Sequence, residues 1–295
     1  IAKPIPMNAV TLSETRPLSE AVPPRGWRAD LRLAYGRRGE RTALIERSHV
    51  GPLVVQQPLY PEGEAVCHTI LVHPPAGIAG GDQLSVSVRV DAGAHALLTT
   101  PGAGKWYRSA GPRGSLSQRI EIAAGAVCEW LPQESIVYDG AVGELSTEVE
   151  LQGDACFIGS EMLCFGRTGS GERFTRGELS MRTRLVRDGR PLWLERGRVG
   201  GGAALLDSPV GLQGEPVCGS LLVASPKVDV ALLEAWREIV PEVGSGGVTL
   251  LPGLLVARYL GPGCEPGRAW FARLWAAVRP AMTGREMQIP RIWNT

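Results

Sequence analysis

The chain has 295 residues, of which 44% are hydrophobic and 21% are charged, and its formal net charge is +1. This composition is typical of a folded protein with a substantial core and excludes an intrinsically disordered chain. Nucleic-acid-binding proteins usually carry an excess of basic residues, so we expect no nucleic-acid partner. The 38 glycines and 23 prolines indicate many turns between short elements, as in β-rich folds.

Hydropathy and cysteine usage predict a cytoplasmic protein without a membrane span. No run of about 18 apolar residues is present, so we expect no transmembrane helix. The first 25 residues contain several prolines and polar residues and, as they stand, form no secretory signal. The six cysteines are scattered without a C-x-x-C pair, as expected for thiols in a reducing cytosol: Cys67, Cys128, Cys156, Cys164, Cys218 and Cys264.

Most of the chain up to about residue 195 has the pattern of short β-strands separated by Gly, Pro and Asp. Residues 31–47 alternate in places and predict a hairpin around Gly36 to Gly39. The runs that follow have strand lengths: Leu53–Gln57, Val66–Val72, Leu84–Val90, His95–Thr100, Ser117–Ile122, Val127–Leu131, Glu144–Leu151, Ala155–Met162, Glu178–Val186 and Pro191–Glu195.

One pattern recurs three times, as a strand, a tight glycine turn and another strand. The glycines are Gly93, Gly125 and Gly153, and their spacing is within the range of solenoid repeats. This spacing favours a stacked β architecture in which each unit covers the apolar face of its neighbour. A β-sandwich with similar hairpins is the alternative.

Only the C-terminal third has helical patterns. Ser225 and Pro226 provide an N-cap and a first-turn proline for a helix over residues 226–240, which Pro241 ends. A second helix is predicted over residues 266–279. Apolar side chains recur at helical spacing and predict faces packed against the sheet rather than cofactor sites: Val228, Ala231, Leu232, Ala235 and Ile239 on the first helix, and Trp270, Phe271, Leu274, Ala277 and Val278 on the second.

The most unusual loop is His73–Leu84, which reads HPPAGIAGGDQL. Its two prolines cannot donate to a strand ladder, and its glycines permit backbone conformations closed to other residues. Such a loop can hold Asp82 in a fixed place. An ordinary structural turn accounts equally well for the composition.

The segment Leu98–Ser109 reads LTTPGAGKWYRS and superficially suggests a phosphate loop. The pattern G-x-x-x-x-G-K-[ST] requires Gly at position 99 and Ser or Thr at position 106, where this chain has Thr99 and Trp106. We therefore expect no nucleotide binding. Trp, Tyr and Arg are frequent anchors of protein interfaces, so the segment predicts a partner-binding surface: Lys105, Trp106, Tyr107 and Arg108.

Two further segments gather carboxylates, Glu129–Asp139 and Glu161–Glu172. The plainer interpretation is that Glu129 and Glu161 are half-exposed strand residues paired with arginines. The four histidines show no metal-ligand spacing and no G-x-S-x-G motif occurs, so neither a tight zinc-type site nor a serine hydrolase is predicted.

Taken together, these segments resemble the UreD (UreH) family of urease accessory proteins. The hallmark loop of that family is similar to residues 73–82, although Ala76 stands where the family often has Gly. The matches run in order from about residue 30 to the C-terminus, which makes the resemblance specific. They are GPL at Gly51–Leu53, QPLYP at Gln57–Pro61, TTPGAGKWYRS at Thr99–Ser109 with Gly104 and Trp106 as variants, EWLPQE at Glu129–Glu134, GRTGSGE at Gly166–Glu172 and PRIW at Pro290–Trp293.

The resemblance implies a mainly β fold, a right-handed β-helix-like stack of strands with two C-terminal α-helices. We expect residues 1–29 to be a poorly structured N-terminal extension and residues 30–295 to be a single β-rich domain. The resemblance also implies a non-enzymatic protein, because GTP hydrolysis in the urease system belongs to UreG.

The same resemblance implies binding of the urease apoprotein and of UreF, which recruits the nickel-carrying GTPase UreG. No cofactor is then bound tightly, and nickel(II) passes in transit through an internal channel. Because a conduit must release its cargo, we expect weak oxygen ligands along it. The candidates lie in or beside turns of the matching segments: Asp82, Glu134, Asp139, Glu161 and Glu172. At least two of them are expected to brace loops through arginines such as Arg108 and Arg167.

Two other functions stay open. One is a β-helical carbohydrate-active enzyme, which would use clustered Asp and a basic residue. The other is a scaffold that bridges urease and UreF without nickel passing through it.

Overall fold

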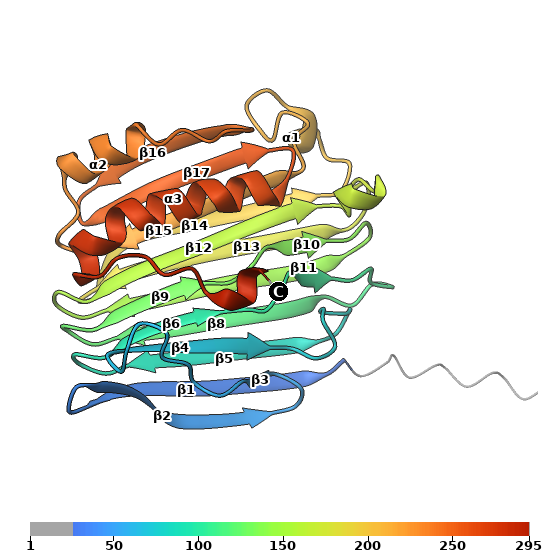
Figure 1. Cartoon of the computed structure of the whole chain (residues 1–295). Helices are drawn as coiled ribbons and strands as arrows, with labels where there is room; N and C mark the ends of the chain where they lie inside the picture. Colours follow the sequence, from blue (N-terminus) through green and yellow to red (C-terminus); the bar gives the residue numbers. More distant parts are fainter. Residues whose placement is uncertain (1–25, 295) are drawn as a thin grey trace, which may run out of the picture.

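The computed structural model describes residues 26–294, which form two facing stacks of strands (Figure 1). The first sheet has seven strands in the order β14-β13-β11-β8-β5-β1-β2. The second sheet has ten, in the order β16-β17-β15-β12-β9-β6-β4-β3, with β10 beside β12 and β7 beside β10.

The strands have the following bounds: β1 Arg28–Arg38, β2 Arg41–Val50, β3 Val54–Val55, β4 Val66–Val72, β5 Gln83–Val90, β6 His95–Thr99, β7 Gly104–Trp106, β8 Gly114–Ile122, β9 Val127–Leu131, β10 Ser135–Val137, β11 Val142–Leu151, β12 Cys156–Phe165, β13 Glu178–Arg187, β14 Arg190–Gly200, β15 Val217–Ala224, β16 Ser245–Leu251 and β17 Leu254–Gly261. The predicted strand runs are all present. Only residues 26–29 of the predicted N-terminal extension are described, and β1 begins at Arg28; residues 1–25 lie outside the described residues.

The chain winds from one sheet to the other as it goes from β4 to β13. Neighbours in the series β1-β5-β8-β11-β13 and in the series β4-β6-β9-β12 pair in parallel. Parallel pairing between successive turns of the chain is the arrangement of a β-solenoid, whereas a sandwich built of hairpins would pair antiparallel. The solenoid prediction is therefore confirmed, and the handedness of the coil stays a prediction.

The three repeated glycines lie at the corners where the chain passes from the first sheet to the second. Gly93 and Gly125 have φ of 71° and Gly153 has φ of 52°, the left-handed region that other residues rarely adopt. In each corner an amide donates to the carbonyl three residues before it: Ala94 to Asp91, Ala126 to Ala123 and Ala155 to Gln152. Gly153 holds the second position of its turn and the other two hold the third, so the last corner is a variant of the first two.

Two apolar layers hold the molecule together. Inward side chains of both sheets fill the space between them; on β5 these are Leu84, Val86, Val88 and Val90. The outer face of the second sheet carries α3 (Cys264–Thr283), and α2 (Val230–Arg237) packs beside β16 (Figure 1). The remaining helices are short: α1 Ala204–Asp207 and the 3-10 turns Thr168–Ser170 and Arg291–Asn294. Within residues 26–294 no helix combines the length and apolarity needed to cross a membrane.

Both predicted helices exist, but the boundaries of the first were wrong. The α2 helix begins at Val230 because the Asp229 carboxylate accepts a hydrogen bond from the Leu232 amide (2.9 Å) and so caps it. The hydroxyl of Ser225 instead accepts from the Lys227 amide in a separate turn. The buried face of α2 carries Leu233 and Trp236 rather than the predicted alanines, and α3 is longer than predicted.

Three strands in the C-terminal third were missed, namely β15, β16 and β17. The end of β15, Leu221–Ala224, is covered on both faces, so its sequence lacks the polar and apolar alternation that marks a strand with one solvated face. The α3 face also differs from the prediction, because Trp275 is buried in place of the exposed Ala277.

A buried charge cluster attaches α3 to the solenoid. The guanidinium of Arg279 is fully buried and donates to Glu129 (3.0 Å) and Glu62 (2.7 Å). Glu129 also contacts the His95 ring (2.6 Å) and accepts from the Trp275 indole (2.6 Å). The expectation that Glu129 is half-exposed was therefore wrong, since its carboxylate is covered by the helix and keeps its charge by pairing.

Candidate functional site

The space between the sheets is not completely filled. A cavity of about 390 Å³ lies at the end opposite the glycine corners, between β5, β8 and the loops around His73 and Thr100. A second cavity of about 180 Å³ lies farther along the stack, between the strands around β12 and β14. The two cavities share the lining residues Trp130, Ser160 and Glu161, so they adjoin at the middle of β12.

The strand ladder of the second sheet is interrupted beside the large cavity, and we call this break the opening. β9 pairs with β12 as far as Gly159, and β10 resumes the pairing at Leu163. Between them Pro132 has no amide hydrogen to continue the ladder. A third cavity, of about 230 Å³, lies on the outer side under α3 and the C-terminal turn, and it shares Pro132 and Gln133 with the large one.

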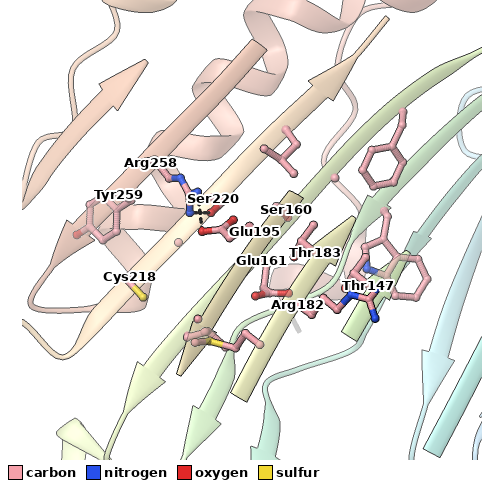
Figure 2. Close-up of a pocket in the computed structure, with 18 residues that line it drawn as sticks. Thr147, Ser160, Glu161, Arg182, Thr183, Glu195, Cys218, Ser220, Arg258 and Tyr259 are labelled. Carbon is pink, nitrogen blue, oxygen red and sulfur yellow. Dashed lines mark hydrogen bonds and ion pairs between the residues drawn. The ribbon is translucent and has the colours of Figure 1, made fainter. Parts of the chain in front are cut away.

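Glu161 lines both inner cavities, and Figure 2 shows it at the smaller one. Its charged neighbours are Glu195 of β14, on the facing sheet, and Arg258 of β17, in the same sheet as Glu161. Arg258 is already engaged, since it donates to Glu195 (2.6 Å) and to the Ser220 hydroxyl (2.7 Å). The Glu161 carboxyl itself forms no hydrogen bond or ion pair with any residue in the described range 26–294.

This environment changes the acidity of Glu161. Burial of the carboxyl raises its pKa to about 7, the charge of Glu195 adds to the rise, and Arg258 opposes it. Near neutral pH the group therefore exchanges its proton readily. A cation in the cavity would favour the carboxylate and displace that proton.

Two softer ligand groups lie on the same walls. Burial raises the pKa of the Cys218 thiol to about 12, so it is neutral at physiological pH. The Nε2 atom of His73 is buried without a hydrogen-bond partner at the large cavity, and burial lowers the pKa of this ring. Across residues 26–294, no three or more His, Cys, Asp or Glu side chains are grouped closely enough to hold a metal ion.

Three of the other predicted acids hold loops. The Asp82 carboxylate accepts from the amides of Trp27 and Ala79 (both 2.8 Å), which fixes the proline-glycine loop against the chain entering β1. Asp139 and Glu172 are brought together, because the Asp139 amide donates to the Glu172 carboxylate (3.0 Å).

Both of those carboxylates also bind arginines at the same end of the stack. Arg176 pairs with Asp139 at 2.7 Å, and Arg167 pairs with Glu172 at 2.6 Å. Hydrogen bonds from Arg176 and Thr175 hold the pKa of Asp139 well below its usual value, so the group stays charged. Bracing by Arg167 agrees with the sequence-based expectation.

Glu134 differs from these three. It lies beside the opening, and its Oε2 is 3.3 Å from the Nε of Arg268 on α3. The geometry of this contact is not that of a hydrogen bond, so both atoms are buried without a hydrogen-bond partner among the described residues. Arg268 also donates to the Gln133 side chain, which lines the opening. Of the five predicted acids, only Glu161 lines the inner cavities; Glu134 follows Gln133 of the lining, and Glu172 lines a separate cavity of about 200 Å³.

The predicted partner-binding segment is only partly on the surface. The Trp106 ring is 2% exposed and packs over Gly143 in the core. Tyr107 is half-buried against Tyr138, whereas Arg108 is exposed. A partner can therefore reach the segment only through the residues around Trp106.

Sequence reasoning missed Glu195, Arg258, Cys218 and the role of His73. The first three lie on β14, β15 and β17, which are brought beside Glu161 by strand pairing and facing sheets rather than by proximity in sequence. No spacing rule connects them. For His73 a signal existed, because it opens the unusual loop.

Comparisons with known proteins agree with the resemblance seen in the sequence. The family model described as UreD urease accessory protein matches residues 28–294. A urease accessory protein UreD from Azoarcus sp. (strain BH72) is 68% identical over 289 residues, covering 98% of this chain and all of the relative. Two more with the same name, from Dechloromonas aromatica and Pseudomonas fluorescens Pf-5, are each 52% identical, cover 95% of this chain and are covered to 98% and 99% of their own lengths. This chain therefore belongs to the UreD family of urease accessory proteins.

Proposed function

We propose that this chain is a non-enzymatic scaffold in urease maturation that conducts nickel(II) through the cavities between its sheets. The observation that carries the proposal is Glu161, an unpaired carboxyl at the junction of two inner cavities. A carboxyl that lines an inner cavity without a hydrogen-bond or ion-pair partner is available to a ligand that visits the site.

The chemistry of Glu161 suits transit rather than storage. A single carboxylate with a neighbouring thiol and an imidazole farther along offers a divalent ion a few ligands at a time, and water supplies the rest. The proton on Glu161 leaves as the ion arrives and returns as it departs, because its pKa is about 7. The site thereby carries little net charge when it is empty.

The other four candidate acids support this path in two ways. Glu134 lies beside the opening, paired with Arg268, and acts as a gating group. Asp82, Asp139 and Glu172 hold the loops at the same end and act on the path through loop position.

The partners in this proposal are the urease apoprotein and UreF, with UreG bound through UreF. The names of the related proteins support a role beside urease. Nickel enters or leaves at the loop end, where the opening lies. Lys105, Tyr107 and Arg108 lie at that end and form part of a partner contact.

The test is a co-expression of the chain with urease subunits and the other accessory proteins, comparing wild type, Glu161→Gln and Glu144→Gln. Glu144 is an exposed glutamate on the outer face of the first sheet and serves as the matched control. We expect Glu161→Gln to co-purify with urease normally while the nickel content and activity of urease fall several-fold. Glu161→Asp should recover part of the loss.

Two results would overturn the conduit. Fully nickel-loaded urease with Glu161→Gln would leave a scaffold that only bridges its partners. Loss of the urease complex in that variant would make Glu161 a structural residue. GTP turnover or polysaccharide cleavage by the purified chain would contradict the non-enzymatic role.

A further inference from the structure

Four arginines gather on the outer face of the first sheet, on its last two strands. They are Arg182 and Arg184 on β13 and Arg196 and Arg198 on β14. On β14 the alternate residues Glu195 and Gly197 line the smaller inner cavity, so the two arginines of that strand point to the outer face. Arg182 lies directly opposite Arg196, and opposite residues of an antiparallel pair share a face. We call the four side chains the arginine patch.

Strand pairing places like charges side by side in this patch. The register of β13 and β14 sets Arg182 against Arg196. Like charges directly opposite one another destabilise a sheet. A conflict of this kind with the chemistry of folding is typical of a surface that serves another purpose.

The acids of the chain neutralise only two of the four arginines. Arg182 pairs with Glu148 at 3.3 Å, and Arg198 pairs with Glu178 at 2.5 Å. These two contacts show that carboxylates bind on this face.

The other two arginines are left without an acid. Arg184 and Arg196 form no hydrogen bond or ion pair with any residue of the described range 26–294. Two guanidinium groups beside bound carboxylates therefore have room for further carboxylates, which Arg binds through paired hydrogen bonds.

The patch also lies at a free edge of the sheet. β14 is the last strand and pairs only with β13. Beyond that ladder, the backbone of Arg190–Val199 makes no hydrogen bond to the backbone of residues 26–294. An edge strand offers its unpaired amide and carbonyl groups to an added strand. Leu194 lies opposite Arg184 and is 64% exposed, so the same edge carries an apolar contact.

We propose that the arginine patch and the free edge of β14 bind an acidic extended segment of a partner protein. The segment adds a strand beside β14. Its alternate side chains are carboxylates that lie on the outer face, over Arg196 and Arg198, because side chains alternate between the faces of a strand. The same arginines repel a second copy of β14, so the edge favours an acidic partner over self-association.

This interaction is independent of the conduit. The arginine patch lies on the outer face of the first sheet, whereas Glu161 lies on the second sheet at the inner cavities. Loss of nickel transit would leave the binding of an acidic segment unchanged.

The experiment measures the binding of a fluorescent peptide of alternating Glu and Thr to the purified full-length chain by fluorescence anisotropy. We expect binding that weakens as salt is added, and none of the matching peptide of Lys and Thr. Arg196→Glu should weaken binding roughly tenfold, because an attraction becomes a repulsion. Arg32→Glu is the matched control, since Arg32 is exposed on β1 of the same sheet and lies opposite Ser48 and Ser87, and it should bind as the wild type does.

The Arg196→Glu variant also separates binding from folding. It places a carboxylate opposite Arg182, so its melting temperature should be no lower than that of the wild type. Equal peptide binding by wild type and Arg196→Glu would overturn the proposal, as would equal weakening in Arg32→Glu, which would indicate attraction by net charge alone. Absence of binding to the wild-type chain would leave the arginines as charges that keep the edge unpaired. Tighter binding of a single-stranded oligonucleotide than of the peptide would assign the patch to phosphates instead.

Discussion

The two ends of the solenoid are built differently. At one end the chain turns through three short corners, around Gly93, Gly125 and Gly153, each closed by the same kind of hydrogen bond. At the other end it returns through long loops that interrupt the second sheet, and Asp82, Glu134 and the Asp139–Glu172 contact lie there. The regular end supplies repeated packing, whereas the irregular end carries the groups that a ligand or partner can reach.

The largest expected effect comes from disrupting the buried charge cluster that attaches α3 to the solenoid. Arg279→Met leaves Glu129 and Glu62 buried without their cation, so we expect the free energy of unfolding to fall by about 3–5 kcal/mol. Urea denaturation followed by circular dichroism measures the loss. Arg273→Met is the matched control on the same helix, since its guanidinium is exposed, and should cost about 1 kcal/mol or less. Equal losses in the two variants would mean that the buried cluster adds no stability.

The C-terminal turn covers the irregular end and should matter next. The Trp293 indole donates to the Thr99 hydroxyl (2.7 Å), and its ring lies 6.0 Å from that of Trp275. Because the ring is only half-buried, we expect Trp293→Ala to lower the free energy of unfolding by about 2 kcal/mol. Thermal melting compares it with Ile289→Ala, whose side chain is 44% exposed and should have a smaller effect. An unchanged melting temperature would show that the tail contributes nothing to the fold.

Glu161→Gln should stabilise the protein while impairing its function. The pKa of Glu161 in the folded protein, about 7, exceeds the ordinary glutamate value of 4.5, so the folded state retains a proton that the unfolded chain loses. Stability is therefore lost as the pH rises from about 4.5 to 7, and the loss is complete above 7. We expect the variant to gain about 1–3 kcal/mol at pH 8 and nothing at pH 4. Denaturation at both pH values measures this, and a gain of the same size in Glu144→Gln would contradict it.

The smallest expected effect comes from substituting one glycine at each end of the solenoid. Gly125→Ala places a side chain at φ of 71° in a corner and should cost about 1 kcal/mol. Gly102 lies in the interrupted stretch between β6 and β7, where an added Cβ meets nothing and φ is ordinary, so Gly102→Ala should be neutral. If both substitutions are neutral, the corner does not depend on glycine.

The solenoid itself was predictable from the sequence. Each coil repeats the same local events, a strand, a glycine turn and another strand, and local chemistry is what a sequence shows directly. The runs Val66–Val72 and Val127–Leu131 match β4 and β9 at both ends for this reason. The family could also be inferred, because its motifs are contiguous segments.

The candidate site was only half predictable. Its acids were found because they lie in distinctive motifs, although Glu161 lies in the middle of β12 and not in or beside a turn as predicted. Nothing in the sequence separated Glu161, which is unpaired, from Asp139, which is bound to Arg176. The sequence likewise did not reveal that Glu129 is buried and paired, because its partner Arg279 lies far along the chain.

The sequence by itself determined which residues form turns, which segments alternate between polar and apolar side chains, and which family motifs occur in order. Only the tertiary structure decided which charges meet. Glu161 lies beside Glu195 and Arg258, and Glu129 meets Arg279, because strands from separate coils and a returning helix bring these side chains together. Burial and pairing set the acidity of a group, and both depend on neighbours that lie close in space and far apart in sequence.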